Sequence, residues 1–269
     1  MVNTYSIDGK VQGKVKLPDI FNTEYRPDLI QKAVVSLQSQ RRQQYGVSVM
    51  AGMRTSAKYF GRRRKAFRVT INHAMSRLPR EKTGGGGLGK VRMVPQSVGG
   101  RMAHPPKVEK IYAKKINNKE YVMALKSAIA ALANRELVEK RGHKVSNLKE
   151  VPIVVEDGFE KLSKTKDVLT LLQSLGLEEE ISRAKEKKIR SGRGKMRDRR
   201  YKRKKSLLII VNSDANVIKG SKNIPGVDVI KVDELNVELL APGAHAGRLS
   251  LWTKGALEKV DSAIKNGTN

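Results

Sequence analysis

Residues 84–90 read GGGGLGK, a pattern with the chemistry to hold a nucleotide phosphate. It fits the first seven positions of the P-loop, in which backbone N–H groups cradle phosphates. That motif continues with Ser or Thr, which supplies a hydroxyl to Mg²⁺, whereas Val91 follows here. The flanking residues indicate neither a preceding strand nor a following helix. We therefore interpret the glycines as backbone freedom that lets the chain approach RNA phosphates closely, with a flexible linker as the alternative.

Basic side chains are concentrated in two segments. Residues 41–110 contain seventeen Lys or Arg and two acidic residues, a net charge of +15, and residues 183–205 contain fourteen and two, a net charge of +12. The remainder of the chain carries only +2 of the total of +29. Charge this concentrated repels itself unless a polyanion neutralises it. The pattern predicts nucleic-acid binding, with a solvated surface as the alternative.

Aromatic residues accompany the densest basic run, GRRRKAFRV at residues 61–69. Tyr59, Phe60 and Phe67 lie within or beside it. Basic side chains bind phosphates, and arginine or aromatic faces stack on unpaired bases. A nuclear-import signal has a similar composition. The spread of charge over two distant segments favours extended RNA contact.

Side chains that usually carry out catalysis or bind metals show no comparable grouping. His73, His104, His143 and His245 are far apart and lack metal-ligand spacing, and the chain has no cysteine. No Ser–His–acid set or carboxylate pair stands out. We therefore expect no enzyme, no cofactor and no metal. For His73 and His104, RNA contact or loop packing is favoured over proton transfer.

The composition is that of a protein without a membrane anchor. The 269 residues allow one large domain or two small ones. No run approaches the roughly 18 apolar residues of a membrane span. The first residues lack the basic-then-apolar layout of a signal peptide. We expect a cytoplasmic protein.

Hydrophobic periodicity predicts an α/β fold: a mainly parallel sheet flanked by helices, since apolar strands alternate with helices. A β-hairpin is expected around Asp8-Gly9. Helices are expected at residues 27–37, 118–141, 178–188 and 253–264, with a further one capped by Ser163 and ending before Gly176. Strands are expected at 151–155, 207–211, 227–230 and 247–251.

A long basic extended loop, or arm, is predicted to be inserted near the N-terminus. Residues 45–113 lack the apolar periodicity needed for a core, and loops this long are usually functional or disordered. Residues 1–44 and 114–269 then form the globular body. Residues 183–205 are an RNA-contacting segment within that body.

Several blocks of sequence together resemble a known family. They are a Pro-led helix, GGGG and VGGRMAHPPK in the loop, NKEYVMALKSAIAALA, NIPGVDV and LWTKGALEKV. In this order they resemble the L-four family of large-subunit ribosomal proteins, in its archaeal form. The resemblance covers nearly the whole chain, and the loop with its return helix is its most specific part.

The resemblance implies a structural constituent of the large ribosomal subunit, located in cytoplasmic ribosomes and taking part in subunit assembly. The implied partners are large-subunit ribosomal RNA and neighbouring large-subunit ribosomal proteins, with no membrane and no homo-oligomer. The loop would thread the RNA, and its tip would help to line the nascent-peptide exit tunnel. By this resemblance, the residues that correspond to the family's tunnel-proximal tip are Arg80, Glu81, Lys82, Thr83, Gly84, Gly85, Gly86 and Gly87.

Two other functions compete with this one. The first is an α/β nucleotide-binding enzyme that uses residues 84–90, and the second is a free RNA chaperone or regulator.

The residues expected to bind RNA are Arg41, Arg42, Arg54, Lys58, Arg62, Arg63, Arg64, Lys65, Arg68, Arg77, Lys90, Arg92, Arg101, His104, Lys107, Arg190, Arg193, Lys195, Arg197, Arg199, Arg200, Lys202 and Arg203.

Overall fold

The computed structural model describes residues 1–59, 70, 72–213 and 215–266, and the chain divides into two units. Unit 1 comprises residues 1–40 and 113–269, and unit 2 comprises residues 41–112. These divisions fall close to the limits of 44/45 and 113/114 that the sequence suggested for the body and the arm.

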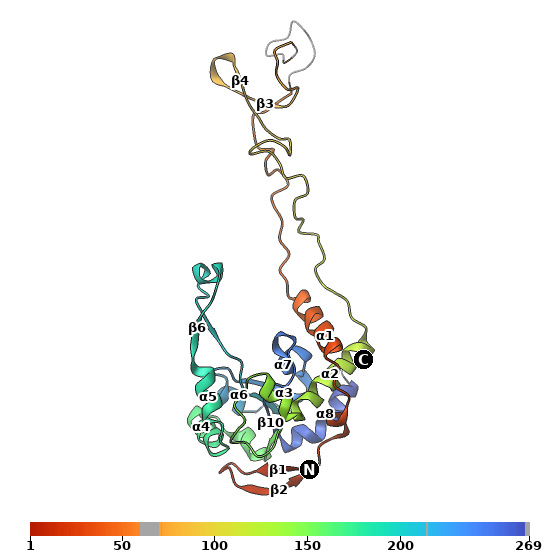
Figure 1. The fold of residues 1–269 in the computed structure, drawn as a ribbon, viewed down its shortest axis with the longest axis vertical. Helices are drawn as coiled ribbons and strands as arrows, with labels where there is room; N and C mark the ends of the chain where they lie inside the picture. Colours follow the sequence, from red (N-terminus) through yellow and green to blue (C-terminus); the bar gives the residue numbers. More distant parts are fainter. Residues whose placement is uncertain (60–69, 71, 214, 267–269) are drawn as a thin grey trace. The chain divides into compact units, whose positions relative to one another are not determined.

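Unit 1 contains both helices and strands, and they are interspersed along the chain (Figure 1). They are β1 (Val2–Tyr5), β2 (Val11–Val15), α1 (Pro27–Gln40), α2 (Asn118–Ala133), α3 (Arg135–Lys140), β5 (Ile153–Val155), α4 (Thr165–Ser174), α5 (Glu178–Lys185), β6 (Lys187–Ile189), β7 (Tyr201–Arg203), β8 (Leu208–Val211), α6 (Val217–Ser221), β9 (Asp228–Lys231), α7 (Val237–Leu240), β10 (Ser250–Thr253) and α8 (Lys254–Asn266). Short 3₁₀ turns lie at Asp19–Asn22, Asp157–Lys161, Arg193–Arg197, Val232–Glu234 and Pro242–Ala244.

Among the described residues, six strands form the main sheet of unit 1, in the order β2-β1-β5-β10-β8-β9. β1 and β2 are an antiparallel hairpin, and Gly9 supplies the positive φ of +80° at its turn. All other neighbouring strands are parallel. The predicted α/β fold, a mainly parallel sheet flanked by helices, is confirmed.

Successive side chains of the central strands enter two separate cores, as the period of two in a β-strand requires. On β8, Leu208 and Ile210 face one core while Ile209 and Val211 face the other. Helices α1, α2, α7 and α8 cover the first face, and α4 and α6 cover the second. Burial on both faces explains why the β8 run is apolar throughout.

Helix α1 packs beside α2, as expected of the two helices that flank the inserted segment. The Ser36 hydroxyl donates to the Lys114 carbonyl at 2.6 Å, and the Lys114 N–H donates to the Ser39 hydroxyl at 2.8 Å. The chain therefore leaves unit 1 at the end of α1 and rejoins it beside the same helix.

Two predicted helices end earlier than periodicity suggested. Residues 118–141 form two helices because Asn134 interrupts them in an extended conformation and its side chain caps α3, accepting the Leu137 N–H at 3.3 Å. Helix α5 stops at Lys185 because the next residues pair with a later strand as β6. None of the described helices is long and apolar enough to cross a membrane.

Unit 2 doubles back along itself and contains a small hairpin of β3 (Arg80–Lys82) and β4 (Leu88–Val91) (Figure 1). The rings of Tyr45 and Tyr112 stack with centroids 6.1 Å apart. Close approach requires glycine at Gly52, whose φ is +76° and where a Cβ would meet the Gly100 carbonyl at 2.5 Å.

Unit 2 has almost no core of its own. Ala57 is the one hydrophobic residue that is buried among the described residues of the unit. Apolar burial is the main driving force for folding, so unit 2 gains little stability from its own contacts. The described polar contacts, such as the 3.0 Å pair between Glu81 and Arg92, are partly exposed and contribute little more.

Candidate nucleic-acid interface

The second basic segment folds as an exposed antiparallel hairpin, which we call the basic hairpin (residues 187–203). Strands β6 and β7 are exposed along their whole length. Their register places Lys187 opposite Arg203 and Lys188 opposite Lys202. Like charges directly opposite each other in an antiparallel pair are destabilising, by roughly 0.2–1 kcal/mol a pair. The hairpin therefore presents cations at close range that its own strands do not compensate.

An aromatic ring lies among these cations. Tyr201 on β7 is exposed, with the Lys187 ammonium 5.6 Å and the Arg200 guanidinium 5.7 Å from its ring centroid. An exposed ring flanked by cations matches the stacking platforms that bind unpaired bases. The surface has the elements needed to contact both phosphates and bases.

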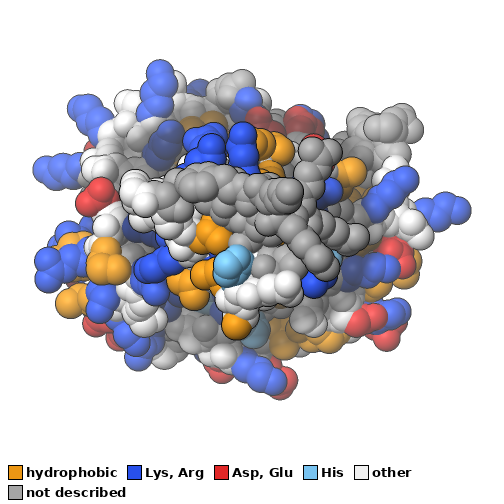
Figure 2. Space-filling model, turned by 90° about the horizontal axis from the view of Figure 1, so that it is seen from above, with side chains coloured by type: hydrophobic (Ala, Val, Ile, Leu, Met, Phe, Trp, Pro, Cys, Tyr) orange, Lys and Arg blue, Asp and Glu red, His pale blue; other side chains and the backbone are white. Residues whose placement is uncertain are grey.

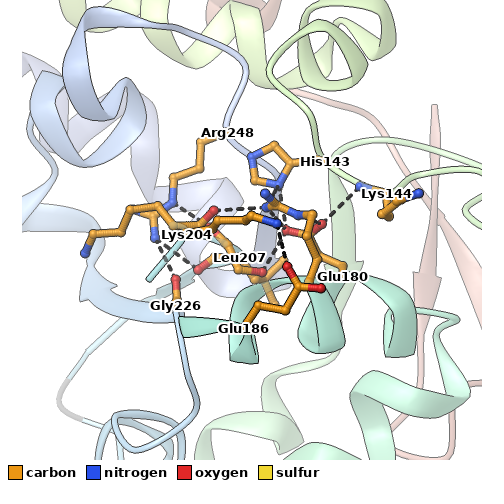
Figure 3. Close-up of polar contacts among 11 residues, drawn as sticks. His143, Lys144, Glu180, Glu186, Lys204, Leu207, Gly226 and Arg248 are labelled. Carbon is orange, nitrogen blue, oxygen red and sulfur yellow. Dashed lines mark hydrogen bonds and ion pairs between the residues drawn. The ribbon is translucent and has the colours of Figure 1, made fainter. Parts of the chain in front are cut away.

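A buried carboxylate fixes the foot of the basic hairpin to the body, and we call its contacts the Glu180 network (Figure 3). The Glu180 side chain on α5 is 1% exposed and accepts two bonds from Arg183, at 2.6 and 2.8 Å. It also accepts from the Ser206 hydroxyl at 2.8 Å, and Arg183 donates to the Lys205 carbonyl at 3.0 Å. Both ends of the hairpin are thereby joined.

Hydrogen bonding decides the charge of this carboxylate. Burial alone would raise the pKa of Glu180, but bonds from His143, Arg183 and the Lys144 N–H outweigh it and lower the pKa to about 2. Burial, in contrast, lowers the pKa of His143, so its ring is neutral near pH 7. The ring nitrogen Nδ1 lies 2.8 Å from the Glu180 carboxylate. In the neutral ring it carries the hydrogen and donates a hydrogen bond to that carboxylate.

Arg248 links the segment before β8 to β9 (Figure 3). Its side chain is fully buried and donates to the carbonyls of Ser206 and Leu207 at 2.8 and 3.2 Å. It also pairs with Asp228 on β9 at 2.6 Å. Burial lowers the pKa of Arg248, and the Asp228 carboxylate opposes that shift. This arginine therefore holds the segment that joins the basic hairpin to β8.

In unit 2 the described candidate residues are mostly exposed cations. Figure 2, which shows one face of the whole molecule, has more Lys and Arg than acidic side chains in view. Several candidates already contact residues of their own segments: Arg92 pairs with Glu81, Arg54 donates to the Ser48 hydroxyl at 3.0 Å, and Arg190 donates to the Arg199 carbonyl at 3.0 Å. The exposed ones are Arg41, Arg42, Arg54, Lys58, Arg77, Lys90, Arg101, His104 and Lys107 in unit 2, and Arg193, Lys195, Arg197, Arg199, Arg200, Lys202 and Arg203 in the basic hairpin.

Five of the expected RNA-binding residues lie outside the described residues. They are Arg62, Arg63, Arg64, Lys65 and Arg68.

The glycine-rich stretch does not have the architecture of a P-loop. Gly84–Gly86 form a short turn between β3 and β4, and the following residues continue as antiparallel strand rather than helix. A P-loop requires a strand, the loop and then a helix whose N-terminus faces the phosphates. The expected tip, residues 80–87, therefore corresponds to β3 and this turn.

Sequence reasoning missed the network that holds the hairpin in position. Glu180 and Ser206 are 26 residues apart, and Glu180 and His143 are 37 apart. The one available signal was an arginine, Arg248, placed directly before an apolar strand.

Within the described residues, no group of three His, Cys, Asp or Glu side chains is arranged to hold a metal ion.

Comparisons with known proteins agree on one family. The model of the ribosomal protein L4/L1 family matches residues 15–263. The large ribosomal subunit protein uL4 of Methanosphaera stadtmanae is 47% identical over 260 residues, covering 96% of this chain and 95% of that protein. The proteins of the same name from Methanococcus aeolicus and Archaeoglobus fulgidus are each 48% identical, covering 97% and 94% of this chain and 98% and 95% of their own.

Replacement of Glu180 by Gln tests the network. We expect Glu180→Gln to lower the free energy of unfolding at pH 7 by about 3 kcal/mol, because Arg183 loses its buried partner. The folded pKa of about 2 lies below the ordinary value of 4.5, so the ionised group stabilises the protein above pH 4.5 and this contribution is lost as the pH falls toward 2. The difference in the free energy of unfolding between the original chain and Glu180→Gln should therefore become smaller as the pH falls from 4.5 toward 2.

Urea unfolding at pH 7, 4.5 and 2.5 measures the difference. Glu178→Gln, an exposed position on the same helix, is the matched control and should change stability by less than about 0.5 kcal/mol. A loss at Glu180 no larger than in the control, or one independent of pH, would contradict the role assigned to the network.

Proposed function

Because the chain belongs to the ribosomal protein L4/L1 family, we propose that it is a structural constituent of the large ribosomal subunit. It binds large-subunit ribosomal RNA and adjoins other proteins of that subunit in cytoplasmic ribosomes. Its archaeal relatives are each named a large ribosomal subunit protein, which supports the assignment. The family is one of ribosomal proteins rather than enzymes, so the role is structural.

The observation that carries RNA binding is the opposition of like charges in the basic hairpin. Lys187 faces Arg203, and Lys188 faces Lys202, on strands whose residues are all exposed. A free protein gains nothing from this arrangement, since it costs stability. A polyanion lying along the hairpin converts the repulsion into attraction, and contacts with RNA phosphates do so without requiring a particular sequence.

Unit 2 is proposed to act as an arm that orders fully when it lies between segments of ribosomal RNA. Its scarcity of buried apolar side chains supports this, because the stability missing from the free arm is then supplied by phosphate contacts at assembly. The body docks first, the arm becomes ordered, and RNA segments distant in sequence are held together. Arg62, Arg63, Arg64, Lys65, Arg68 and Arg101 would contact phosphates.

The tip of the arm, residues 80–87, is proposed to help line the nascent-peptide exit tunnel. The compact β3–β4 hairpin supports this, because a narrow two-stranded element with glycines at its turn fits a confined passage. At that turn Gly85 has a φ of +77° and no neighbouring atom within 4 Å of an added Cβ. Backbone conformation, more than packing, therefore calls for glycine there.

The basic hairpin can be tested by removing one of its opposed pairs. We expect the double variant Lys188→Gln/Lys202→Gln to bind large-subunit ribosomal RNA more weakly and to reduce the salt dependence of log K by about 2, near 0.9 for each lost phosphate contact. Its melting temperature should stay equal or rise slightly, since repulsion is relieved. Filter binding across a salt series and thermal unfolding provide the two readouts.

The matched control is Lys14→Gln/Lys16→Gln, which removes one exposed lysine on the edge strand β2 and one directly after it. It should leave the salt dependence of binding to the same RNA almost unchanged. A salt slope that is the same in both double variants would count against RNA contact by the hairpin.

The tip is tested by a photo-crosslinking residue at Lys82, which is exposed on β3. In ribosomes that contain the variant and are stalled on a nascent chain, irradiation should link this position to the nascent peptide. The same residue at exposed Lys166 on α4 should not crosslink. Equal crosslinking at both positions, or none at Lys82, would remove the tunnel from the proposal.

A further inference from the structure

A cavity of about 990 Å³ lies beside the Glu180 network in unit 1, and we call it the basic pocket. Its wall includes five Lys or Arg side chains and two histidines: Lys140, Arg141, Arg183, Lys204, Lys205, His143 and His245. Among the residues that line it, Asp28 is the one acidic side chain, and Arg26 already pairs with it at 2.8 Å. The wall thus favours an anionic occupant.

The cations of the pocket are unevenly compensated. Arg183 has Glu180, and Lys204 and Lys205 have Glu186 and Asp228, each at 2.6–2.8 Å. Arg141 has no carboxylate: its Nη2 donates to the Pro242 carbonyl at 3.0 Å, and its buried Nη1 has no hydrogen-bond partner among the described residues. A buried guanidinium nitrogen without an acceptor is costly.

The charges around Arg141 add to that cost. Burial, followed by the positive charges of Arg248 and Arg183, lowers the pKa of Arg141 to about 10. Three guanidinium groups therefore act on one another at this point, with fewer carboxylates than cations among them. An anion in the pocket would relieve this repulsion and give Nη1 an acceptor.

His143 supplies a second unpartnered atom in the same wall. Its Nδ1 faces Glu180, and Nε2, on the other side of the ring, is buried without a partner among the described residues (Figure 3). A neutral ring offers only a lone pair there. When an anion is present, protonation of Nε2 would make it a donor, so the ring responds to occupancy.

We propose that the basic pocket binds a phosphate group, with Arg141 and Lys140 as its principal donors and His143 as a third. The pocket lies at the foot of the basic hairpin, since Lys204 and Lys205 directly follow β7. A phosphodiester chain that follows the hairpin therefore reaches the pocket without a break in positive charge. That the phosphate belongs to RNA, rather than to a free phosphate ester, rests on the proposed function.

The four histidines of the chain make the test specific. His143 and His245 line the pocket, whereas His73 and His104 lie in unit 2. We expect inorganic phosphate, added to the histidine-labelled full chain at constant ionic strength with chloride as counter-anion, to shift the NMR resonances of the first two with saturation. The pKa of His143 should rise, because a bound dianion opposes the effect of Arg183 and Arg141. His73 and His104 should not move.

Variants locate the response. Arg141→Gln should weaken the response to phosphate by about tenfold or more, as expected for the loss of a charged hydrogen bond. Lys140→Gln, an exposed position, should weaken it several-fold and keeps the test valid if Arg141→Gln does not fold. Lys166→Gln, at an exposed position on α4 that does not line the pocket, removes the same charge as a control and should leave the response intact. An unchanged response in both pocket variants, or equal shifts of all four histidines, would overturn the proposal.

The source of the phosphate is tested by repeating the titration with a short RNA oligonucleotide and with an acidic peptide of equal charge. A His143 shift with RNA that Lys140→Gln reduces supports the backbone as ligand. A shift with the peptide and none with RNA or phosphate overturns the proposal. If the chain fails to bind ribosomal RNA while the His143 response to phosphate persists, the proposed function falls and the pocket stands as a site for a free phosphate ester.

Discussion

Repulsion between like charges at short range is the constraint on which the rest of this structure depends. Nearly all of the net charge of +29 lies in two segments. The basic hairpin places lysine and arginine opposite one another, and unit 2 carries its cations with hardly any buried apolar side chain. Both arrangements become favourable when a polyanion is bound.

The body resolves this constraint by holding each segment at its ends. Glu180, kept ionised by its hydrogen bonds, joins the chain before and after the basic hairpin. Arg248 binds the Ser206 carbonyl, in the segment that joins the basic hairpin to β8. For unit 2, the hydroxyls of Ser36 and Ser39 bind the chain where it returns to unit 1. The well-packed body thus holds two basic segments that bury few apolar side chains of their own.

The parts of the fold that follow from local pattern were predictable from sequence, and those that depend on distant partners were not. The run LLIIV indicated a strand buried on both faces, and β8 is one. The interruption between α2 and α3 at Asn134 depends on a single capping hydrogen bond, which hydrophobic periodicity does not predict. Composition identified the basic residues, but the opposition of Lys188 and Lys202 required the register of the hairpin. The Glu180 network joins residues too far apart for any spacing rule.

The central claim is that this chain belongs to the large ribosomal subunit through contacts with its RNA. Sedimentation of a cell extract in moderate salt, with detection of the chain in every fraction, tests it most directly. The account predicts stoichiometric migration with large subunits, and release only at high salt or after ribonuclease treatment. A chain found mainly in the free-protein fractions would contradict it and would favour a free RNA chaperone or regulator.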